Sequence, residues 1–245
     1  MVARVIEAEF GIVYHPGHVR KILHELGFSV QRPRRTLLRA DPAQQQHWAR
    51  WIYPSLKREA RAEGAALLFT DEATFRVDPT LHQTWARVGQ QPQIPTTGKR
   101  EAEKILGVVN LFTCRFPDRH DAPFNAQTYV GFLEQIVRKY APQKVWLIHD
   151  RASYHKDDEV GDWLREHRRH IQAHLLPPYS PEFNPMERVW HYIRLNGTHN
   201  RYFLSREELR DTLTREFRSI QSNPVQMDTS DCIARLMLQK LCAAI

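Results

Sequence analysis

Cysteine is scarce in this sequence, and its three residues, Cys114, Cys232 and Cys242, are widely spaced and odd in number. This pattern excludes a disulfide framework and a cysteine-rich zinc site. Glycine is also scarce, at 10 residues, and no GxGxxG motif for dinucleotide binding occurs. No apolar run is long enough to cross a membrane, and Glu7 and Glu9 interrupt any signal-peptide core. We therefore expect a cytoplasmic protein without a membrane partner.

Basic residues outnumber acidic ones, and the excess is concentrated near the N-terminus. The chain carries 35 Lys and Arg against 28 Asp and Glu, with a formal net charge of +7 and a pI near 9.5. Between His18 and Arg39 there are six Lys or Arg but a single acidic residue, Glu25. This distribution favours a polyanionic partner.

The first forty residues have the pattern of a small DNA-binding module. The segment HPGHVRKILHELG has apolar residues at helical spacing and ends at Gly27, as at a helix C-cap. The segment FSVQRPRRTLLR that follows predicts a basic, extended wing. We therefore predict a partial winged helix-turn-helix module over residues 1–40. Its expected DNA contacts are Arg20, Lys21, His24, Arg32, Arg34 and Arg35. The alternative is a solvated basic face on a small helical cap.

Residues 41–64 predict a connector helix. Asp41 followed by Pro42 is typical of a helix start, with Asp as the N-cap. Pro54 is expected to kink the helix and Gly64 to end it. The side expected to pack inward carries Trp48, Ile52 and Leu56.

The remaining residues, 65–245, predict a mixed α/β sheet with helices on both faces. The segment ALLFTDEATFRVD is interpreted as a buried strand, a turn and a second strand, and EKILGVVNLFTCRF, KVWLIHD and IQAHLLP as further strands. Amphipathic helices separate the later strands. The six tryptophans are scattered, and we expect them to face the core.

Two carboxylates are predicted at the ends of strands, where functional groups gather in open α/β sheets. Asp71 follows ALLFT, and Asp150 follows the wholly apolar VWLIH. Two such carboxylates on neighbouring strands would repel one another unless a cation lay between them, and Mg²⁺ prefers carboxylate oxygens. The alternative is that each Asp simply terminates a strand.

The segment LPPYSPEFNPMERVW changes from a proline-rich stretch to a helix and contains two glutamates. Glu187 falls in the first turn of the predicted helix, where it could aim across the strand ends. The competing interpretation is a capping box, with Asn184 as N-cap and Glu187 reaching back to its backbone N–H. Glu182 is interpreted as a solvated side chain of the loop.

Three segments taken in order, TDEATF, LIHDRASYH and LPPYSPEFNPMERVW, resemble the DDE transposases of the mariner superfamily and its bacterial insertion-sequence branch. The resemblance runs from the basic module to about Tyr202 and implies a ribonuclease-H-like core. Matched position by position, Asp71, Asp150 and Glu187 correspond to the three catalytic and metal-binding acids. Family members usually carry two helix-turn-helix units, so the resemblance implies a shortened N-terminus.

The resemblance implies a transposase that cleaves the ends of an insertion element and transfers the strand to target DNA. Two Mg²⁺ ions, or Mn²⁺ as a substitute, would clamp the attacking and leaving oxygens, with Asp150 bridging both ions. The implied partners are double-stranded DNA and a second copy of the chain in a homodimer, in a bacterial, nucleoid-associated protein. Two alternatives stay open: a catalytically inactive DNA-binding remnant, and a nuclease on the same core.

The sequence departs from the family beside the second acid. Arg151 stands where the family often has Asn, and a cation there would either bind a DNA phosphate or weaken metal binding by repulsion. His155 matches a position often occupied by His, which we interpret as a supporting residue and not as a catalytic base.

Overall fold

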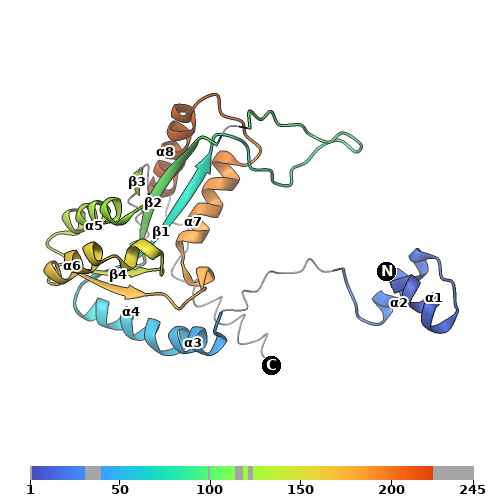
Figure 1. Cartoon of the computed structure of the whole chain (residues 1–245), viewed down its shortest axis with the longest axis horizontal. Coiled ribbons are helices and arrows are strands. Elements are labelled where there is room, and N and C mark those ends of the chain that lie inside the picture. The colour runs from blue at the N-terminus through green and yellow to red at the C-terminus, as the bar shows by residue number, and fades with distance from the viewer. Residues whose placement is uncertain (1, 31–39, 99, 114–117, 121–123, 223–245) are drawn as a thin grey trace. The chain divides into compact units, whose positions relative to one another are not determined.

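The computed structural model describes residues 2–30, 40–98, 100–113, 118–120 and 124–222 (Figure 1), which divide into two compact units, residues 1–38 and 39–245. In the first unit, α1 (Val2–Phe10) is followed by α2 (Pro16–Glu25). The α2 helix matches the predicted one: the His15 side chain caps its start, and Gly27 after its end has a positive φ of 81°. The α2 residues Arg20, Lys21 and His24 are exposed, whereas Arg32, Arg34 and Arg35 lie outside the described residues.

The second unit is built on a mixed sheet of five strands in the order β3-β2-β1-β4-β5. The strand bounds are β1 Ala66–Arg76, β2 Ala102–Asn110, β3 Asp118–His120, β4 Val145–His149 and β5 Ile171–Leu175. β1 pairs antiparallel with β2 and parallel with β4, while β2–β3 is antiparallel and β4–β5 parallel. The mixed α/β sheet predicted from the sequence is therefore confirmed.

The first strand differs from its prediction, because β1 is one continuous strand and not two strands joined by a turn. β2 pairs with it without interruption from Leu68 to Arg76, so Asp71 lies within the strand and not at its end. The parallel pairing with β4 does stop earlier, at Phe69 opposite Ile148. Asp71 therefore lies two residues after Phe69, the last residue of β1 in the parallel pairing. Asp150 lies two residues after Ile148, the partner of Phe69 on β4.

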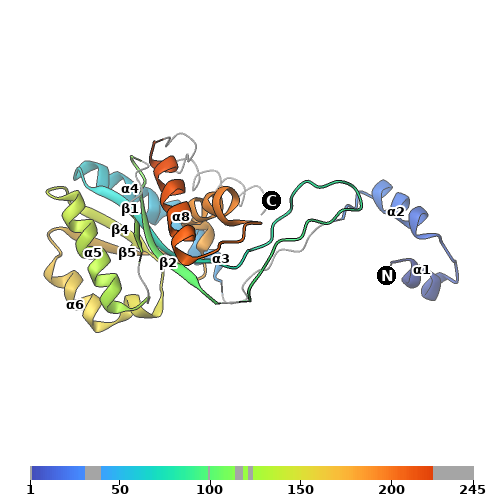
Figure 2. The same cartoon turned by 90° about the horizontal axis from the view of Figure 1, so that it is seen from above.

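Helices cover both faces of the sheet, as Figure 2 shows from above. On one face α5 (Ala126–Tyr140) and α6 (Asp158–Glu166) pack on Ala66, Leu68 and their neighbours. On the other face α7 (Met186–Ile193), α8 (Arg206–Ser222) and the helical segment before β1 pack on Leu67 and Phe69. Successive residues of β1 thus alternate between two hydrophobic cores, as the geometry of a strand requires.

The predicted connector is a helix of three parts that packs on the sheet. It comprises α3 (Pro42–His47), the π-helical turn η1 (Trp48–Ile52) and α4 (Tyr53–Ala62), with Asp41 as N-cap. Pro54 has no N–H to donate, and the preceding π turn accommodates it, with the Tyr53 N–H bonded to the Trp48 carbonyl. A π turn adds one residue to the helical turn, and this rotates the side chains that follow around the helix axis. Ile52 is therefore exposed and Tyr53 buried, against the predicted inward position of Ile52.

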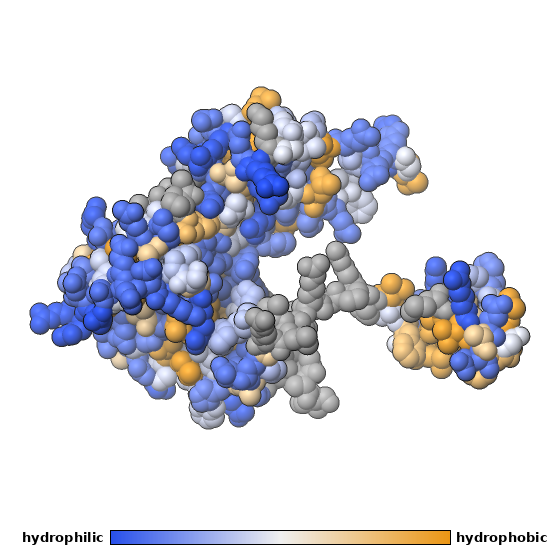
Figure 3. Space-filling view, in the orientation of Figure 1, coloured by the Kyte–Doolittle hydropathy of each residue, from blue (hydrophilic) through white to orange (hydrophobic). Residues whose placement is uncertain are grey.

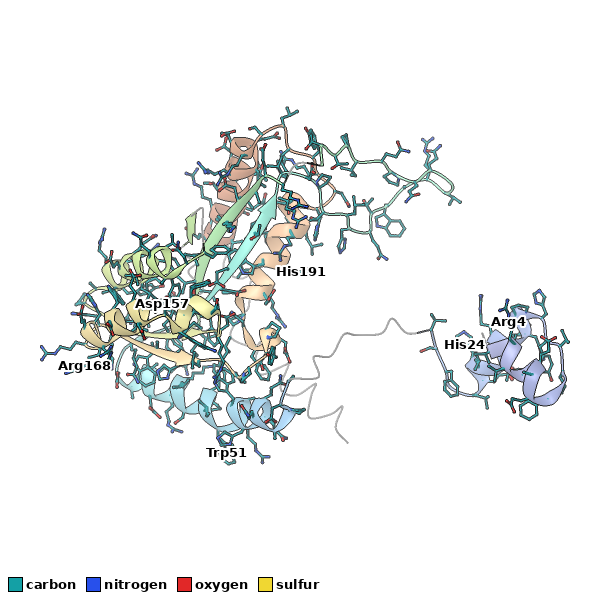
Figure 4. The ribbon with its side chains drawn as sticks, in the orientation of Figure 1. Arg4, His24, Trp51, Asp157, Arg168 and His191 are labelled. Atoms are coloured by element: carbon teal, nitrogen blue, oxygen red, sulfur yellow. The ribbon has the colours of Figure 1, made fainter. Side chains whose placement is uncertain are left out.

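The surface of the second unit is mainly hydrophilic in the view of Figure 3, with scattered small apolar patches. Two tryptophans contribute to the exposed apolar surface, against the expectation that all six face the core: Trp51 is 62% exposed and Trp85 fully exposed. Figure 4 shows Trp51 on the outer side of the helical segment before β1. None of the described helices combines the length and apolar character needed to span a membrane.

Candidate active site

The three carboxylates singled out in the sequence line a single pocket of about 540 Å³ in the second unit. Asp71 comes from β1, Asp150 directly follows β4, and Glu187 lies in the first turn of α7. The end of the parallel β1–β4 ladder brings the first two together, and α7, packed beside β1 and β2, brings the third. Side chains 79 and 116 residues distant from Asp71 thus converge on it.

Asp71 is held by the core of the α7 face. The indole N–H of Trp190 donates to Asp71 Oδ2 at 2.9 Å. Burial raises the pKa of Asp71 well above its ordinary value, and the negative charges of Glu187 and Glu72 raise it further. The carboxylates thus repel one another across the pocket, as the sequence pattern predicted, and a bound cation would relieve that repulsion.

Gly107 permits the contact between Trp190 and Asp71, and sequence reasoning did not single it out. It pairs with Asp71 across the β1–β2 ladder. A Cβ on Gly107 would lie 2.5 Å from Cη2 of Trp190 and 2.7 Å from Cε of Met186. Only a residue without a side chain therefore lets the indole ring lie over β2 and reach Asp71.

Asn184 fixes the start of α7 and decides between the two interpretations of Glu187. Its amide donates to the Thr70 carbonyl at 2.9 Å, and its Oδ1 accepts from the Met186 N–H at 3.1 Å. The Asn184 backbone N–H, which a capping box would need, donates instead to the Pro181 carbonyl at 2.9 Å. The predicted capping box is therefore wrong, and the exposed Glu187 side chain lines the pocket instead.

Glu72 belongs to the site, although sequence reasoning assigns it no role because it predicts a turn after the first strand. As the next residue along β1 it points to the opposite face from Asp71, toward α5 and the short helix η2 (Ser153–Lys156). There Glu72 Oε1 accepts from the Tyr154 hydroxyl and lies 3.2 Å from Nε2 of His155. The other ring nitrogen, His155 Nδ1, lies 3.0 Å from Asp150 Oδ1. His155 thus bridges Glu72 and Asp150.

The electrostatics of this bridge favour a charged His155. Burial alone would lower its pKa, but the contacts with Asp150 and Glu72 outweigh burial and raise the pKa to about 9. Burial opposes ionisation of Asp150 as well, yet the hydrogen bonds from His155 and the Ala152 N–H lower its pKa. The buried Tyr129 ring packs against His155 at a tilt of 38°, with 4.1 Å between ring centroids. His155 therefore supports the Asp150 carboxylate, in the role the sequence predicted.

The donor atoms suit a hard divalent cation. Asp71, Glu72 and Asp150 each offer an oxygen, and these oxygens lie within 4.8 Å of one another. Carboxylate oxygens are the ligands that Mg²⁺ and Mn²⁺ take in proteins. Glu187 lines the same pocket, and its charge is strong enough there to raise the pKa of Asp71. The site therefore combines the chemistry of a divalent metal centre with a pocket open to substrate.

Comparisons with known proteins agree with this geometry. The family model described as DDE superfamily endonuclease matches residues 66–210, and one described as winged helix-turn-helix matches residues 1–50. The uncharacterised 39 kDa protein of insertion element IS630 from Shigella sonnei is 27% identical over 191 residues, covering 78% of this chain and 54% of that protein. The Tcb2 transposase of Caenorhabditis briggsae is 24% identical over 188 residues, covering 71% and 67%. The chain thus spans about half the length of the first relative.

Solved structures show the same fold. The Mos1 mariner paired end complex with Mn has a TM-score of 0.70 at 16% identity, covering 98% of this chain and 72% of that chain. A pre-cleavage Mos1 transpososome has the same TM-score and identity, covering 100% and 74%. The ribonuclease-H-like fold and the winged helix-turn-helix module expected from the sequence are thereby confirmed. The DDE endonuclease model matches more than half of the residues of this chain, and the chain therefore belongs to the DDE superfamily of endonucleases.

Proposed function

We propose that the protein is a transposase that cleaves the ends of an insertion element and transfers the cut strand to target DNA, with divalent metal ions. One observation carries the proposal: Asp71, Asp150 and Glu187 reach one pocket from three separate elements of a DDE-family fold. The curated relatives support it, since one belongs to an insertion element and the other is named a transposase. The similar solved structures include a Mos1 strand transfer complex and Mos1 paired end complexes with Mn and Mg.

The carboxylates of the pocket would hold the metal. Asp71, Asp150 and Glu187 would together hold the Mg²⁺ ions, for which Mn²⁺ would substitute. When bound, the ions supply activation of the attacking water or 3′-hydroxyl and stabilisation of the leaving oxygen. The chain itself fixes the acids: Trp190 holds Asp71, and His155 holds Asp150. Asn184 fixes the turn from which Glu187 extends.

The first unit would bind the DNA. Arg20, Lys21 and His24 are exposed on α2, the helix expected to enter the major groove. Arg32, Arg34 and Arg35 would contact phosphates from the wing. Because transposition joins two DNA ends, the active species would be a homodimer on DNA.

The test uses a supercoiled plasmid carrying the genomic sequence that flanks the reading frame. With Mg²⁺ or Mn²⁺ we expect nicking at the element ends followed by strand joining, and neither in a chelator. A chain that shifts duplex DNA and never nicks it would be a binding module. Nicking without joining would make it a nuclease. Either result would overturn the proposal.

Glu187 and Glu182 offer a matched pair of substitutions. Glu187→Gln removes a carboxylate that lines the pocket and is proposed to hold the metal directly, so we expect cleavage to fall by more than about 100-fold, beyond the effect of groups that only support a metal ligand. Glu182 lies five residues earlier in the same proline-rich segment and does not line the pocket. Glu182→Gln should leave the cleavage rate unchanged. Equal rates for the two variants in a single-turnover nicking assay would remove Glu187 from the site.

Glu72 should affect metal affinity in two ways, by its contact with His155 and by the oxygen that it offers beside Asp71 and Asp150. Glu72→Gln replaces the carboxylate by a neutral amide, so the ion pair with His155 is lost and Asp150 is held less firmly. We expect Mn²⁺ affinity to fall about 10- to 100-fold, measured by isothermal titration calorimetry. The matched control is Glu134→Gln, an exposed glutamate on α5, which should bind Mn²⁺ as the wild type does. Unchanged affinity in Glu72→Gln would show that His155 holds Asp150 without it.

A further inference from the structure

The active-site pocket is lined by an aromatic residue and two cationic residues in addition to its carboxylates. Tyr179 lies in the proline-rich segment before α7 and is 47% exposed. Arg151 directly follows Asp150, and Lys156 is the last residue of η2; both are exposed. Holding metal ions requires none of these three side chains. Because these three side chains line the same pocket as the carboxylates, their position indicates a role other than metal binding.

The backbone holds Tyr179 in a conformation that few residues with a side chain adopt. Its φ is +54°, in the left-handed region. Pro177, Pro178 and Pro181 restrict the chain on both sides of it, and the Tyr179 carbonyl accepts a hydrogen bond from the buried Gln45 side chain at 3.3 Å. Strained residues of this kind concentrate at ligand-binding sites. The ring is thus a rigidly positioned, half-exposed flat surface at the pocket.

The two cations are placed to bind negative groups. The Arg151 Nε donates to the Leu176 carbonyl at 3.3 Å, which orients the guanidinium and leaves its terminal nitrogens for other partners. In the part of the chain that the structure describes, neither Arg151 nor Lys156 forms an ion pair with a carboxylate. Arg151 also lines an adjoining hollow of about 480 Å³, which shares Leu176, Pro177 and Pro178 with the active-site pocket. A DNA strand that runs from the active-site pocket past Arg151 would enter this adjoining hollow.

We propose that Tyr179, Arg151 and Lys156 form a subsite for unpaired DNA beside the scissile phosphate. The base of one unpaired nucleotide stacks on the Tyr179 ring, and the two cations bind the phosphates that flank it. Any base can stack on an aromatic ring, and cations beside the ring bind the sugar-phosphate backbone. The subsite therefore distinguishes single-stranded from double-stranded DNA and does not depend on the base sequence. In an intact duplex the bases stack on one another, so no base face is free to contact the Tyr179 ring. This subsite rests on the proposed transposase function, since it gives the pocket its nucleic-acid substrate.

The first test is photo-crosslinking of the full chain to a single-stranded oligonucleotide that carries 5-iodouracil, without divalent metal. We expect the crosslinked peptide to contain Tyr179. Tyr179→Ala should lose this crosslink and bind the oligonucleotide about tenfold more weakly, while Tyr179→Phe should keep the affinity. Trp51→Ala, which removes an exposed aromatic residue outside the pocket, should change neither crosslink nor affinity.

The second test measures the salt dependence of the same binding. Arg151→Gln and Lys156→Gln should each lower the slope of log affinity against log salt concentration by about 0.7, the value for one phosphate contact on a single strand. The control Arg165→Gln removes an α6 arginine that pairs with Asp162 and should leave the slope unchanged. Crosslinks confined to Trp51 or Trp85, or wild-type binding by Tyr179→Ala, would overturn the subsite. These measurements need no cleavage, so a chain that never nicks DNA would refute the proposed function without deciding the subsite's outcome.

Discussion

Replacing Asp150 by Asn is expected to reduce DNA cleavage and strand joining by more than about a hundredfold while leaving the fold intact. Residues that only support a metal ligand typically contribute 10- to 100-fold, and Asp150 is proposed to hold the metal directly. Its carboxylate is also the acceptor for His155 at 3.0 Å, and an amide keeps one oxygen for that contact. The variant should therefore melt near the wild-type temperature. Single-turnover nicking with Mg²⁺ and circular dichroism would measure the two effects.

Asp158→Asn is the matched control for that substitution. Asp158 is an exposed carboxylate at the start of α6, eight residues after Asp150 and outside the pocket lining. Its replacement should leave cleavage unchanged. Duplex binding by the first unit should be the same in both variants, because neither residue belongs to it. Cleavage by Asp150→Asn at more than a tenth of the wild-type rate would remove Asp150 from the metal site.

Gly107→Ala is expected to lower the free energy of unfolding by about 1–3 kcal/mol, the usual cost of overpacking a core. The added methyl group would lie 2.5 Å and 2.8 Å from carbons of the Trp190 ring, so the ring or β2 must move. Trp190 is also the donor to Asp71, and its displacement should reduce cleavage as well. Denaturant unfolding and single-turnover nicking would report the two effects separately.

The same substitution at Gly161 should have the opposite sign. Gly161 lies within α6, and a Cβ there meets nothing within 4 Å. Alanine is favoured over glycine in a helix interior by about 1 kcal/mol, so Gly161→Ala should stabilise the fold and leave cleavage unchanged. If both variants were equally stable, the close approach of Trp190 to β2 would not hold in solution.

Local patterns in the sequence predicted much of this architecture, because they reflect contacts within single elements. The apolar run before Asp150 is a fully buried strand, and Asp41 caps α3 as its position predicts. Asp71 was also found, although its strand continues past it. In these cases composition and spacing report burial or capping directly.

The role of Glu72 could not be predicted in the same way. Its position on the α5 face follows from β1 being continuous, and that depends on β2, which is more than 25 residues away along the chain. Its partner His155 is brought to it by packing of η2 and α5. The capping box at Glu187 failed for a similar reason, since a proline carbonyl in the preceding turn took the Asn184 N–H. The π turn that begins at Trp48 is not visible in the spacing of apolar residues, so the exposure of Ile52 could not be predicted from the sequence.

The alternation along β1 limits where this chain can gain or lose residues. Asp71 and Glu72 are neighbours, but one faces Trp190 and the other faces His155. An in-frame insertion or deletion of one residue between Ala66 and Phe69 would exchange those faces, because the side chains of a strand repeat every two residues. Both supports of the site would be lost together. Among the described residues between Arg76 and Ala102, where β2 begins, none belongs to a named strand, so the length of this segment can change without reversing the two carboxylates.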